Sequence, residues 1–528
     1  MNDQSFWVSV NDLKSYANAF YGLIPGGVSV LDDTDSDIQV PNNTNSFLWG
    51  QYVVPTEGGV WQKSNWQNIR NINYFMTHYQ SVQAAEADVN IYVAEMRFFR
   101  ALEYFNKIQL LGDVPWLEVD LNVDSEELYG PKMKRNQVFQ KIIEDLDFAI
   151  QWLPEAGSEE ANRLNKDIAR HVKARFCLNE GTHYKYHDEL EYASEAEKWL
   201  QMAATESDKL ITSGRYEIYN TGHPQEDYFN MYRIDDKSDL KEAVLYVDYK
   251  TNIREHNMAA AGREAGCGFS KSFVESFLCS DGLPISLSNK YLGDETMRKE
   301  TANRDPRLKQ LILTNDFPTN VTDDLKDSTF VVNEDEFITQ HCFTGYRPIK
   351  GFNPIYSQAL YMKSSFDGIA YRYAETLLIN AEAKAELNTI TNADLDRTVN
   401  QLRDRVGMPH LTVNVGFTDP KWPDWGYSLS PVLQEIRRER CIELAGEGFR
   451  FNDLKRWKAG KLLNNVLTYV GKRKPDGNLA IVYPNYTNPD LSYQAGKSRT
   501  WEDKMYLYPI PTGELQRNPQ LLPQNPGW

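Results

Sequence analysis

The sequence has too few basic residues for a protein that binds nucleic acid. It contains 57 lysine and arginine residues against 74 aspartate and glutamate residues, which gives a formal net charge of −17. Nucleic-acid binding requires a positive face, and so does attachment to an anionic membrane through basic residues. The sequence therefore predicts neither of these functions.

Long hydrophobic runs and paired cysteines are also missing. No apolar stretch approaches the ~20 residues that span a bilayer. The cysteines are odd in number and scattered, without a C-x-x-C pair: Cys177, Cys267, Cys279, Cys342 and Cys441. This pattern indicates neither a disulfide framework nor a zinc site, and a chain of this length needs no such cross-link to form a core.

Motifs of common enzyme classes are absent as well. The chain has no G-x-S-x-G, no H-E-x-x-H and no G-x-G-x-x-G after a predicted strand. His183 and His187 lie four residues apart without an identifiable third metal ligand. The acidic run from Asp32 to Asp37 alternates like a calcium loop but lacks the rest of an EF-hand, which favours a solvated turn. We predict no catalytic residue, no cofactor and no metal, and leave a structural calcium ion open.

Aromatic residues are plentiful, with 12 tryptophans, 30 tyrosines and 23 phenylalanines. Aromatic rings with a polar edge suit surfaces that are half apolar and half wet, such as faces that bind sugars or peptides. The alternative is that many of them fill a large helical core.

Helical periodicity is the main structural signal. Ala94, Phe98, Ala101, Phe105 and Ile108 fall on one helix face, and Gly112 and Pro115 favour an end to that helix. Similar patterns predict helices over 62–79, 136–153, 167–184, 190–213, 370–387, 394–406, 431–446 and 450–463.

These helices come as pairs with short links, and Ala101-x₃-Phe105 before Pro115 weakly matches a tetratricopeptide repeat. We therefore predict a mostly α fold in which a tetratricopeptide-like scaffold covers about 62–214 and 362–465. A loop-rich region spans 215–361, with an N-terminal loop at 25–61 and an extended tail at 466–528, all within one unit. Long loops of this kind are usually functional.

Five segments carry distinctive motifs in a fixed order along the chain. The first is RFFRALEYF to LLGDVPW (97–116), and the second is DGLPI (281–285) with RDPRL (304–308). The helix YRYAETLLINAEA (371–383), the segment RRERCIELAGEGFRFNDLKRW (437–457) and the tail from YPIP (508–511) to QNPGW (524–528) complete the set. Together these segments resemble the motifs of the SusD/RagB family, whose signature R-F-L-R-A-x-x-Y-F … G-x-V-P is similar to 97–116, and they span nearly the whole chain.

This resemblance implies a lipid-anchored protein on the cell-surface face of the bacterial outer membrane. Family members bind oligosaccharides without catalysis and act as the lid of a SusC-type TonB-dependent transporter. The family's signal peptide and lipidated cysteine are not in this sequence, so we expect the chain to start within the mature protein and to reach the membrane only through that anchor.

The resemblance also implies that ligand contacts come from the N-terminal loop and from loops of the irregular half. Sugar recognition needs aromatic faces for the rings and polar groups for the hydroxyls. We hypothesise that Trp49 and Tyr52 stack on the ligand, and that polar contacts come from Asp37, Asn43 and Arg263. Asn257 and Tyr291 are further candidates. The alternative for Trp49 and Tyr52 is that each fixes its own loop to the scaffold.

Other interpretations keep or change the ligand. A second interpretation keeps the fold and the transporter partner but takes peptides as the ligand, since some family members handle peptides. A glycoside hydrolase built on an unrecognised carboxylate pair is less favoured, and a tetratricopeptide-type adaptor overlaps with docking on the transporter. The sequence does not identify the glycan.

Overall fold

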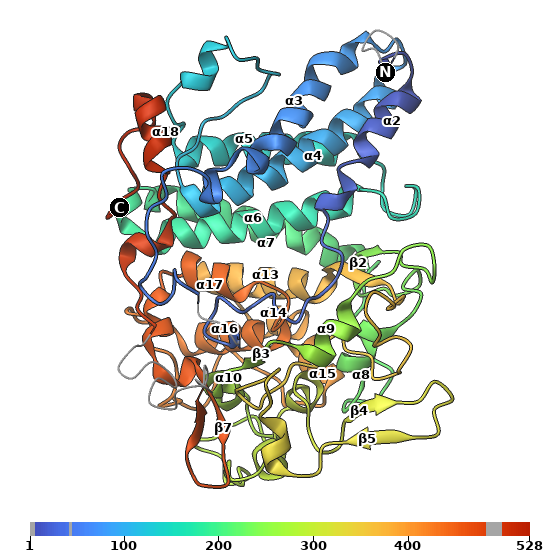
Figure 1. The fold of residues 1–528 in the computed structure, drawn as a ribbon, viewed down its shortest axis with the longest axis vertical. Coiled ribbons are helices and arrows are strands. Elements are labelled where there is room, and N and C mark those ends of the chain that lie inside the picture. The colour runs from blue at the N-terminus through green and yellow to red at the C-terminus, as the bar shows by residue number, and fades with distance from the viewer. Residues whose placement is uncertain (1–5, 42–44, 482–498) are drawn as a thin grey trace. The chain divides into compact units, whose positions relative to one another are not determined.

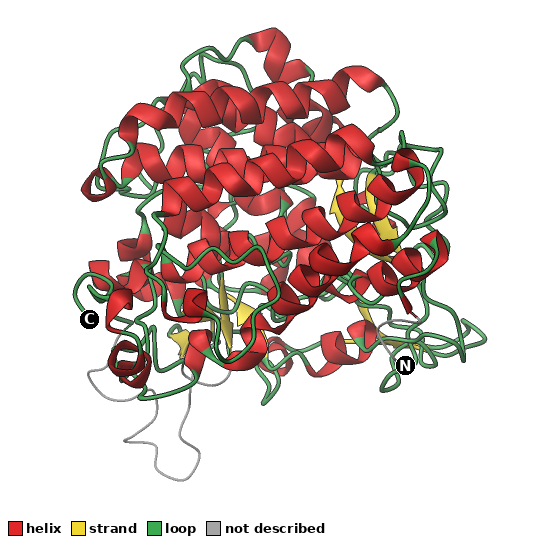
Figure 2. Cartoon of the chain, turned by 90° about the horizontal axis from the view of Figure 1, so that it is seen from above, coloured by secondary structure: helices red, strands yellow, loops and turns green. Residues whose placement is uncertain are grey.

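Helices dominate the computed structural model, which describes residues 6–41, 45–481 and 499–528 (Figures 1 and 2). Strands in these residues form only two-stranded pairs. The prediction of a mostly α fold with tetratricopeptide-like helices is confirmed. Among the described helices, none is both long enough and apolar enough to cross a membrane.

The chain divides into two compact units, each built from separate stretches of sequence. The first unit comprises Met1–Pro25, Tyr52–Phe176 and Glu502–Trp528, and the second comprises Gly26–Gln51 and Cys177–Trp501. The boundary therefore falls within helix α6 (Lys166–Tyr186).

The first unit is built on α2 (Val10–Asn18), α3 (Gln67–His78), α4 (Glu86–Leu111) and α5 (Arg135–Trp152). Helix α4 packs against the other three (Figure 1). Its predicted apolar face is buried, because Ala94, Phe98, Ala101, Phe105 and Ile108 are each at most 4% exposed. The helix ends as predicted at Gly112, whose φ of 75° is a conformation that favours glycine.

Two arginines of the first family-like motif join α4 to α5. Arg97 Nε lies 2.6 Å from Asp145 Oδ1, and Arg100 makes a two-pronged pair with the same carboxylate at 2.7 Å each. Asp145 is buried, so both bonds lie out of water, where charge-assisted hydrogen bonds are strong. The motif thus supplies a clamp between neighbouring helices.

The last residues of the chain, which include α18 (Thr512–Arg517), cap α4. Tyr508 N donates to Leu110 O at 2.8 Å. Asn525 Nδ2 donates to Leu111 O at 2.9 Å and to Tyr508 O at 2.6 Å. These bonds satisfy carbonyls that a helix C-terminus otherwise leaves unpaired.

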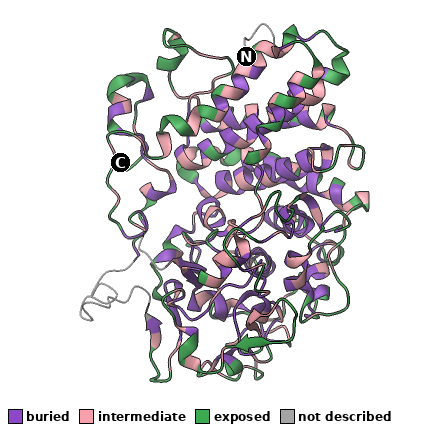
Figure 3. Ribbon diagram, turned by 45° about the vertical axis from the view of Figure 1, so that its right-hand side comes forward, coloured by how far each residue is buried: buried purple, intermediate pink, exposed green. Residues whose placement is uncertain are grey.

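In the second unit, α13 (Tyr373–Glu386) packs against α7 (Ala193–Ser213) and α16 (Pro431–Glu443). Figure 3 shows that the inward faces of the helices are the buried ones. Shorter helices complete the unit: α8 (Asp227–Asn230), α9 (Met258–Glu264), α10 (Lys271–Ser276), α11 (Met297–Thr301), α12 (Arg307–Leu311), α14 (Asn392–Asp396), α15 (Val399–Arg405) and α17 (Arg450–Arg456).

Two predicted helices are shorter than expected. The helix predicted over 394–406 is split into α14 and α15 at Thr398, which has non-helical backbone angles and whose Oγ1 donates to Asp394 O at 2.6 Å. The helix predicted over 450–463 ends as α17 at Arg456, since Lys458 adopts a φ of 51° and only a 3₁₀ turn follows.

The strands pair segments that are distant in sequence. The pairs are β1 (Gln39–Pro41) with β3 (Cys267–Phe269), β2 (Ala243–Val247) with β6 (Gly368–Arg372), β4 (Pro318–Val321) with β5 (Ser328–Phe330), and β7 (Val470–Arg473) with β8 (Leu479–Ile481). All are antiparallel. The β1–β3 pair joins the N-terminal loop to the loop-rich region.

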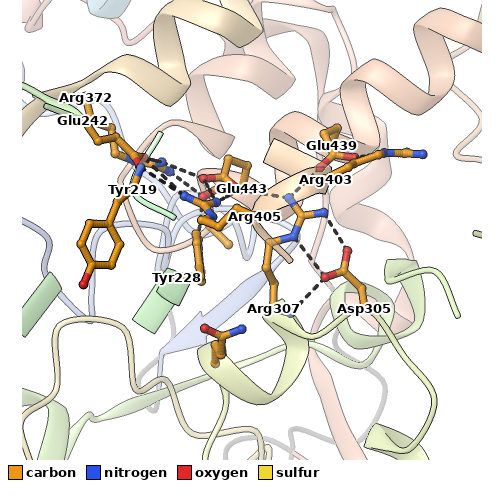
Figure 4. A network of polar contacts seen from close by, with 12 residues as sticks. Tyr219, Tyr228, Glu242, Asp305, Arg307, Arg372, Arg403, Arg405, Glu439 and Glu443 are labelled. Atoms are coloured by element: carbon orange, nitrogen blue, oxygen red, sulfur yellow. Dashed lines mark hydrogen bonds and ion pairs between the residues drawn. The ribbon is translucent and has the colours of Figure 1, made fainter. Parts of the chain in front are cut away.

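A buried network of ion pairs lies inside the second unit (Figure 4). Glu443 accepts from Arg405 at 2.7 Å, from Arg372 at 2.7 Å and from Arg307 at 3.0 Å. Further members are Glu242, Asp305, Lys350, Arg403, Glu439 and Glu447. Three of the family-like motifs, at 304–308, 371–383 and 437–457, therefore meet in one polar core.

Candidate functional site

Helix α9 carries two of the predicted ligand residues. Its sequence, MAAAGRE (258–264), is rich in small residues, and Ala259 and Gly262 lie on its buried side. A Cβ on Gly262 would lie 3.0 Å from the ring of Phe352, so a larger residue here requires the Phe352 side chain to shift. Asn257 and Arg263, at the two ends of the helix, stay half-buried at the surface.

Buried polar side chains hold α9 in place. Arg347 donates from Nε and Nη2 to Gly262 O at 3.0 and 2.9 Å. His256 bonds Phe366 O through Nε2 at 2.8 Å and accepts from Met258 N through Nδ1 at 3.2 Å. Burial lowers the pKa of His256, which keeps the ring neutral and able to accept that bond.

The segment 354–364 runs beside α9 and is fixed at both ends. Near one end, Tyr356 N donates to Val321 O of β4 at 2.9 Å. At the other, Ser364 pairs with His256 through two backbone bonds of 2.9 and 3.1 Å. Between these anchors, Met362 N donates to Asn257 Oδ1 at 3.0 Å. The segment is therefore a rigid loop rather than a loose one.

This loop exposes two tyrosines next to the polar side chains of α9 and β4. Tyr356 is 49% exposed and Tyr361 is 79% exposed. The guanidinium of Arg263 lies 5.9 Å from the ring centre of Tyr356 and donates to Asn320 Oδ1 at 3.0 Å. We call Asn257, Arg263, Asn320, Tyr356 and Tyr361 the tyrosine face. Exposed rings flanked by fixed polar groups suit a ligand with both apolar and hydroxylated sides.

The other predicted residues do not join this face. Asp37 makes a two-pronged ion pair with Arg450, at 2.7 and 2.8 Å, and is only 8% exposed. Trp49 is 6% exposed, and its ring centre lies 5.7 Å from that of Tyr469 in an edge-to-face contact. That position matches the alternative that Trp49 fixes its own loop. Stacking of Trp49 on a ligand stays a prediction.

Tyr52 belongs to the first unit, where its ring centre lies 5.9 Å from Tyr508 and 5.7 Å from Trp528. Tyr291 is half-buried with the guanidinium of Arg304 5.3 Å from its ring centre, and burial raises its pKa. Asn43 lies outside the described residues. Of the predicted residues that the structure describes, only Asn257 and Arg263 are brought together on this face.

The sequence did not single out Tyr356 and Tyr361. The signal was present in NPIYSQALYMKSS (353–365), a stretch without helical periodicity in which two tyrosines are flanked by proline, serine and lysine. The sequence alone does not show that this stretch pairs with β4 and with the start of α9.

The acidic run near the N-terminus is not the solvated turn that its sequence favours, because Asp33 and Asp37 are buried. Asp33 is fully enclosed and accepts from Gly446 N at 2.6 Å and from Arg450 N at 3.1 Å. Burial raises its pKa to about 7 despite these two bonds. Within the described residues, no group of three or more His, Cys, Asp or Glu side chains is arranged to hold a metal ion.

Comparisons with known proteins agree with the motifs. The SusD family model matches residues 212–528. SusD-like protein P2 of Formosa agariphila is 25% identical over 456 residues, covering 84% of this chain and 75% of that protein. The structure of a SusD-like protein from Bacteroides fragilis NCTC 9343 aligns with a TM-score of 0.75 and 24% identity, over 100% of this chain and 99% of that chain. A SusD-like carbohydrate-binding protein from the same strain aligns with a TM-score of 0.73 and 20% identity, over 98% and 100%. The two structures show that the fold is shared.

Proposed function

This chain belongs to the SusD family, and we propose on that premise that it is a non-catalytic protein that binds oligosaccharides at the tyrosine face. It hands them to a SusC-type TonB-dependent transporter in the bacterial outer membrane. One structural relative is described as carbohydrate-binding, which supports a glycan as the ligand. The observation that carries the proposal is the anchored loop that exposes Tyr356 beside Arg263 and exposes Tyr361 next to Met362, which bonds Asn257.

The chemistry of the tyrosine face suits a sugar. The C–H face of a sugar ring packs on an exposed aromatic ring, and the hydroxyl groups need donors and acceptors around it. Arg263 and Asn320 are already oriented by their mutual hydrogen bond. Because the loop is anchored at both ends, little conformational entropy is lost when the ligand binds.

The test is calorimetric titration of the full chain with a panel of α-glucan, fructan and host-type oligosaccharides. We expect Tyr361→Ala and Tyr356→Ala each to weaken binding about tenfold, or roughly 1.4 kcal/mol. Tyr129→Ala is the matched control, since Tyr129 is a 53% exposed tyrosine of the first unit. Equal affinity of all three variants with the wild type would refute the tyrosine face as the ligand site.

The same titration separates the other interpretations. If mixed peptides bind and no sugar does, the protein is assigned to peptide capture on the same fold. Chromatography of a polysaccharide incubated with the protein checks for catalysis. We expect no product, and release of oligosaccharides that is lost on mutating one acidic residue would replace the proposal with a hydrolase.

Location and delivery have their own tests. In intact cells that produce the lipidated protein, we expect antibodies to label the cell surface. We expect a SusC-type transporter to purify with the protein from detergent-solubilised outer membranes. Failure of either result would leave binding intact and remove the delivery step.

A further inference from the structure

A long segment without helix or strand, residues 406–430, connects α15 to α16 in the second unit. Loops longer than about 12–15 residues are uncommon in compact proteins and are usually functional. The indole Nε1 of Trp422 donates to Glu435 Oε1, and that of Trp425 donates to Gln434 Oε1, both at 2.7 Å. The polar edges of both rings are thereby fixed against α16.

A cavity of ≈ 580 Å³ lies between this segment, α10 and α16, entirely within the second unit. Its wall includes the half-buried Trp422, together with Trp425, Phe273 and Leu467. Its volume is within the range of about 300–1,000 Å³ that holds small ligands. It is separate from the tyrosine face, since the two share no residue.

Most acidic groups of the wall are already neutralised. Three wall carboxylates pair with three wall cations, in the pairs Asp37–Arg450, Asp419–Arg438 and Lys421–Glu275, at 2.7, 2.6 and 2.9 Å. The remaining carboxylate, Asp424, is exposed and accepts from Gly426 N at 2.9 Å. The three paired carboxylates therefore have little acceptor capacity left for a ligand, and Asp424 forms no ion pair with any described residue.

Donors, in contrast, are left over. Arg437, 1% exposed, pairs through Nη2 with Glu386 at 2.9 Å, and its buried Nε has no hydrogen-bond partner among the described residues. Lys461 is exposed and forms no ion pair with any described residue. A buried donor without a partner costs about 1–3 kcal/mol, so an occupant that offers acceptors stabilises this wall. The buried Nε of Arg437 and the charge of Lys461 beside an aromatic wall suit an anionic ligand with an apolar face.

We propose that this cavity is a second glycan subsite that takes an acidic sugar unit, with its carboxylate or sulfate towards Lys461 and its ring against Trp422. This inference rests on the proposed function only in that the ligand is a glycan. It does not depend on binding at the tyrosine face.

The test titrates the full chain with three probes: a neutral gluco-trisaccharide, the same trisaccharide ending in glucuronate, and the same trisaccharide bearing a sulfate ester. We expect at least one acidic probe to bind more tightly than the neutral one, and Lys461→Met to abolish this preference with a loss of about tenfold. Lys461→Arg retains the charge and therefore the preference. Lys63→Met is the matched control, because Lys63 is an exposed lysine of the first unit.

The carboxylate and sulfate probes distinguish the two sources of charge, and a preference for either one supports the subsite. Trp422→Leu should also remove the preference, while Tyr361→Ala should leave it and weaken only the neutral probe. Thermal melting confirms that each variant is folded. The subsite is refuted if no acidic probe is preferred, if Lys63→Met equals Lys461→Met, or if Tyr361→Ala alone removes acidic binding. If Tyr361→Ala has no effect on binding of the neutral probe, the tyrosine face is refuted as a ligand site, while the proposal of the acidic subsite is unaffected.

Discussion

At the scale of single residues, the interior of the second unit depends on charges that have been removed from water. Burial alone would raise the pKa of Glu443, but Arg405, Arg372 and Arg307 hold it well below its usual range. Since its pKa is lower in the folded than in the unfolded chain, Glu443 stabilises the fold above pH 4.5. That contribution is lost as the pH falls.

Replacing Glu443 with glutamine keeps its size and removes its charge, which leaves three buried arginines poorly paired. Breaking a buried ion pair in this way typically costs about 3–5 kcal/mol, and we expect a loss of that size in urea unfolding at pH 7. Glu295→Gln is the control, because that glutamate is 60% exposed and its one ion pair within the described part of the chain is with Lys299. Similar urea midpoints for the two variants would contradict a stabilising role for the network.

Asp33 has the opposite dependence on pH. Burial raises its pKa to about 7, so the folded chain keeps a proton that the unfolded chain releases near pH 3.8. Stability contributed by Asp33 is therefore present at low pH and is lost as the pH rises from about 4 to about 7. We expect Asp33→Asn to be more destabilising at pH 5 than at pH 8, as measured by urea unfolding. A difference from the wild type that is the same at both pH values would show that Asp33 does not titrate in this range.

At the scale of elements, the position of α9 depends on the absence of a side chain at Gly262. A valine there places its Cβ 3.0 Å from the ring of Phe352, so either that ring or the helix has to shift. We expect Gly262→Val to lower the affinity of the tyrosine face for oligosaccharide, because Asn257 and Arg263 move with the helix.

Ala260→Val is the control for this change, since it adds a β-branched residue to the half-buried side of the same helix. Calorimetric titration of both variants separates the effect of the close contact at Gly262 from the effect of a β-branched residue on the helix. Equal losses would mean that the close approach at Gly262 does not determine the site.

The C-terminus of α4 depends on residues far along the chain. Asn525→Ala removes the two hydrogen bonds that the side-chain amide donates to Leu111 O and Tyr508 O. We expect a loss of about 1–3 kcal/mol in urea unfolding of the first unit. Gln520→Ala, an exposed change in the same tail, should cost under 0.5 kcal/mol or so. An unchanged free energy of unfolding in Asn525→Ala would show that α4 needs no cap from the tail.

At the scale of the whole molecule, periodic helices and the family-like motifs could be predicted from the sequence, and contacts between distant segments could not. The apolar face of α4 and its end at Gly112 follow from side-chain periodicity and backbone geometry, which are local. The break at Thr398 depends on a side-chain bond to Asp394, so periodicity alone predicted one continuous helix. The family-like motifs predicted the fold, because their arginines and glutamates build its buried polar core.

The candidate site shows the same limit. Asn257 and Arg263 were predicted, but the tyrosines beside them lie about a hundred residues later and are brought close by β4 and by the backbone pairing at His256 and Ser364. Asp37 was predicted as a ligand contact, and no local pattern reveals its partner Arg450, which is separated from it by 413 residues. Pairings at such distances are properties of the fold and not of any one segment.

The division of the first unit into three stretches of sequence has a consequence for how the protein is made. Residues 6–176 leave the ribosome, and cross any export channel, long before Glu502–Trp528 arrive to cap α4 and complete that unit. The first unit thus cannot reach its final stability during synthesis and must wait for nearly the whole chain. Chains cut short by a premature stop are left with an uncapped α4 and exposed apolar surface, which marks them for degradation.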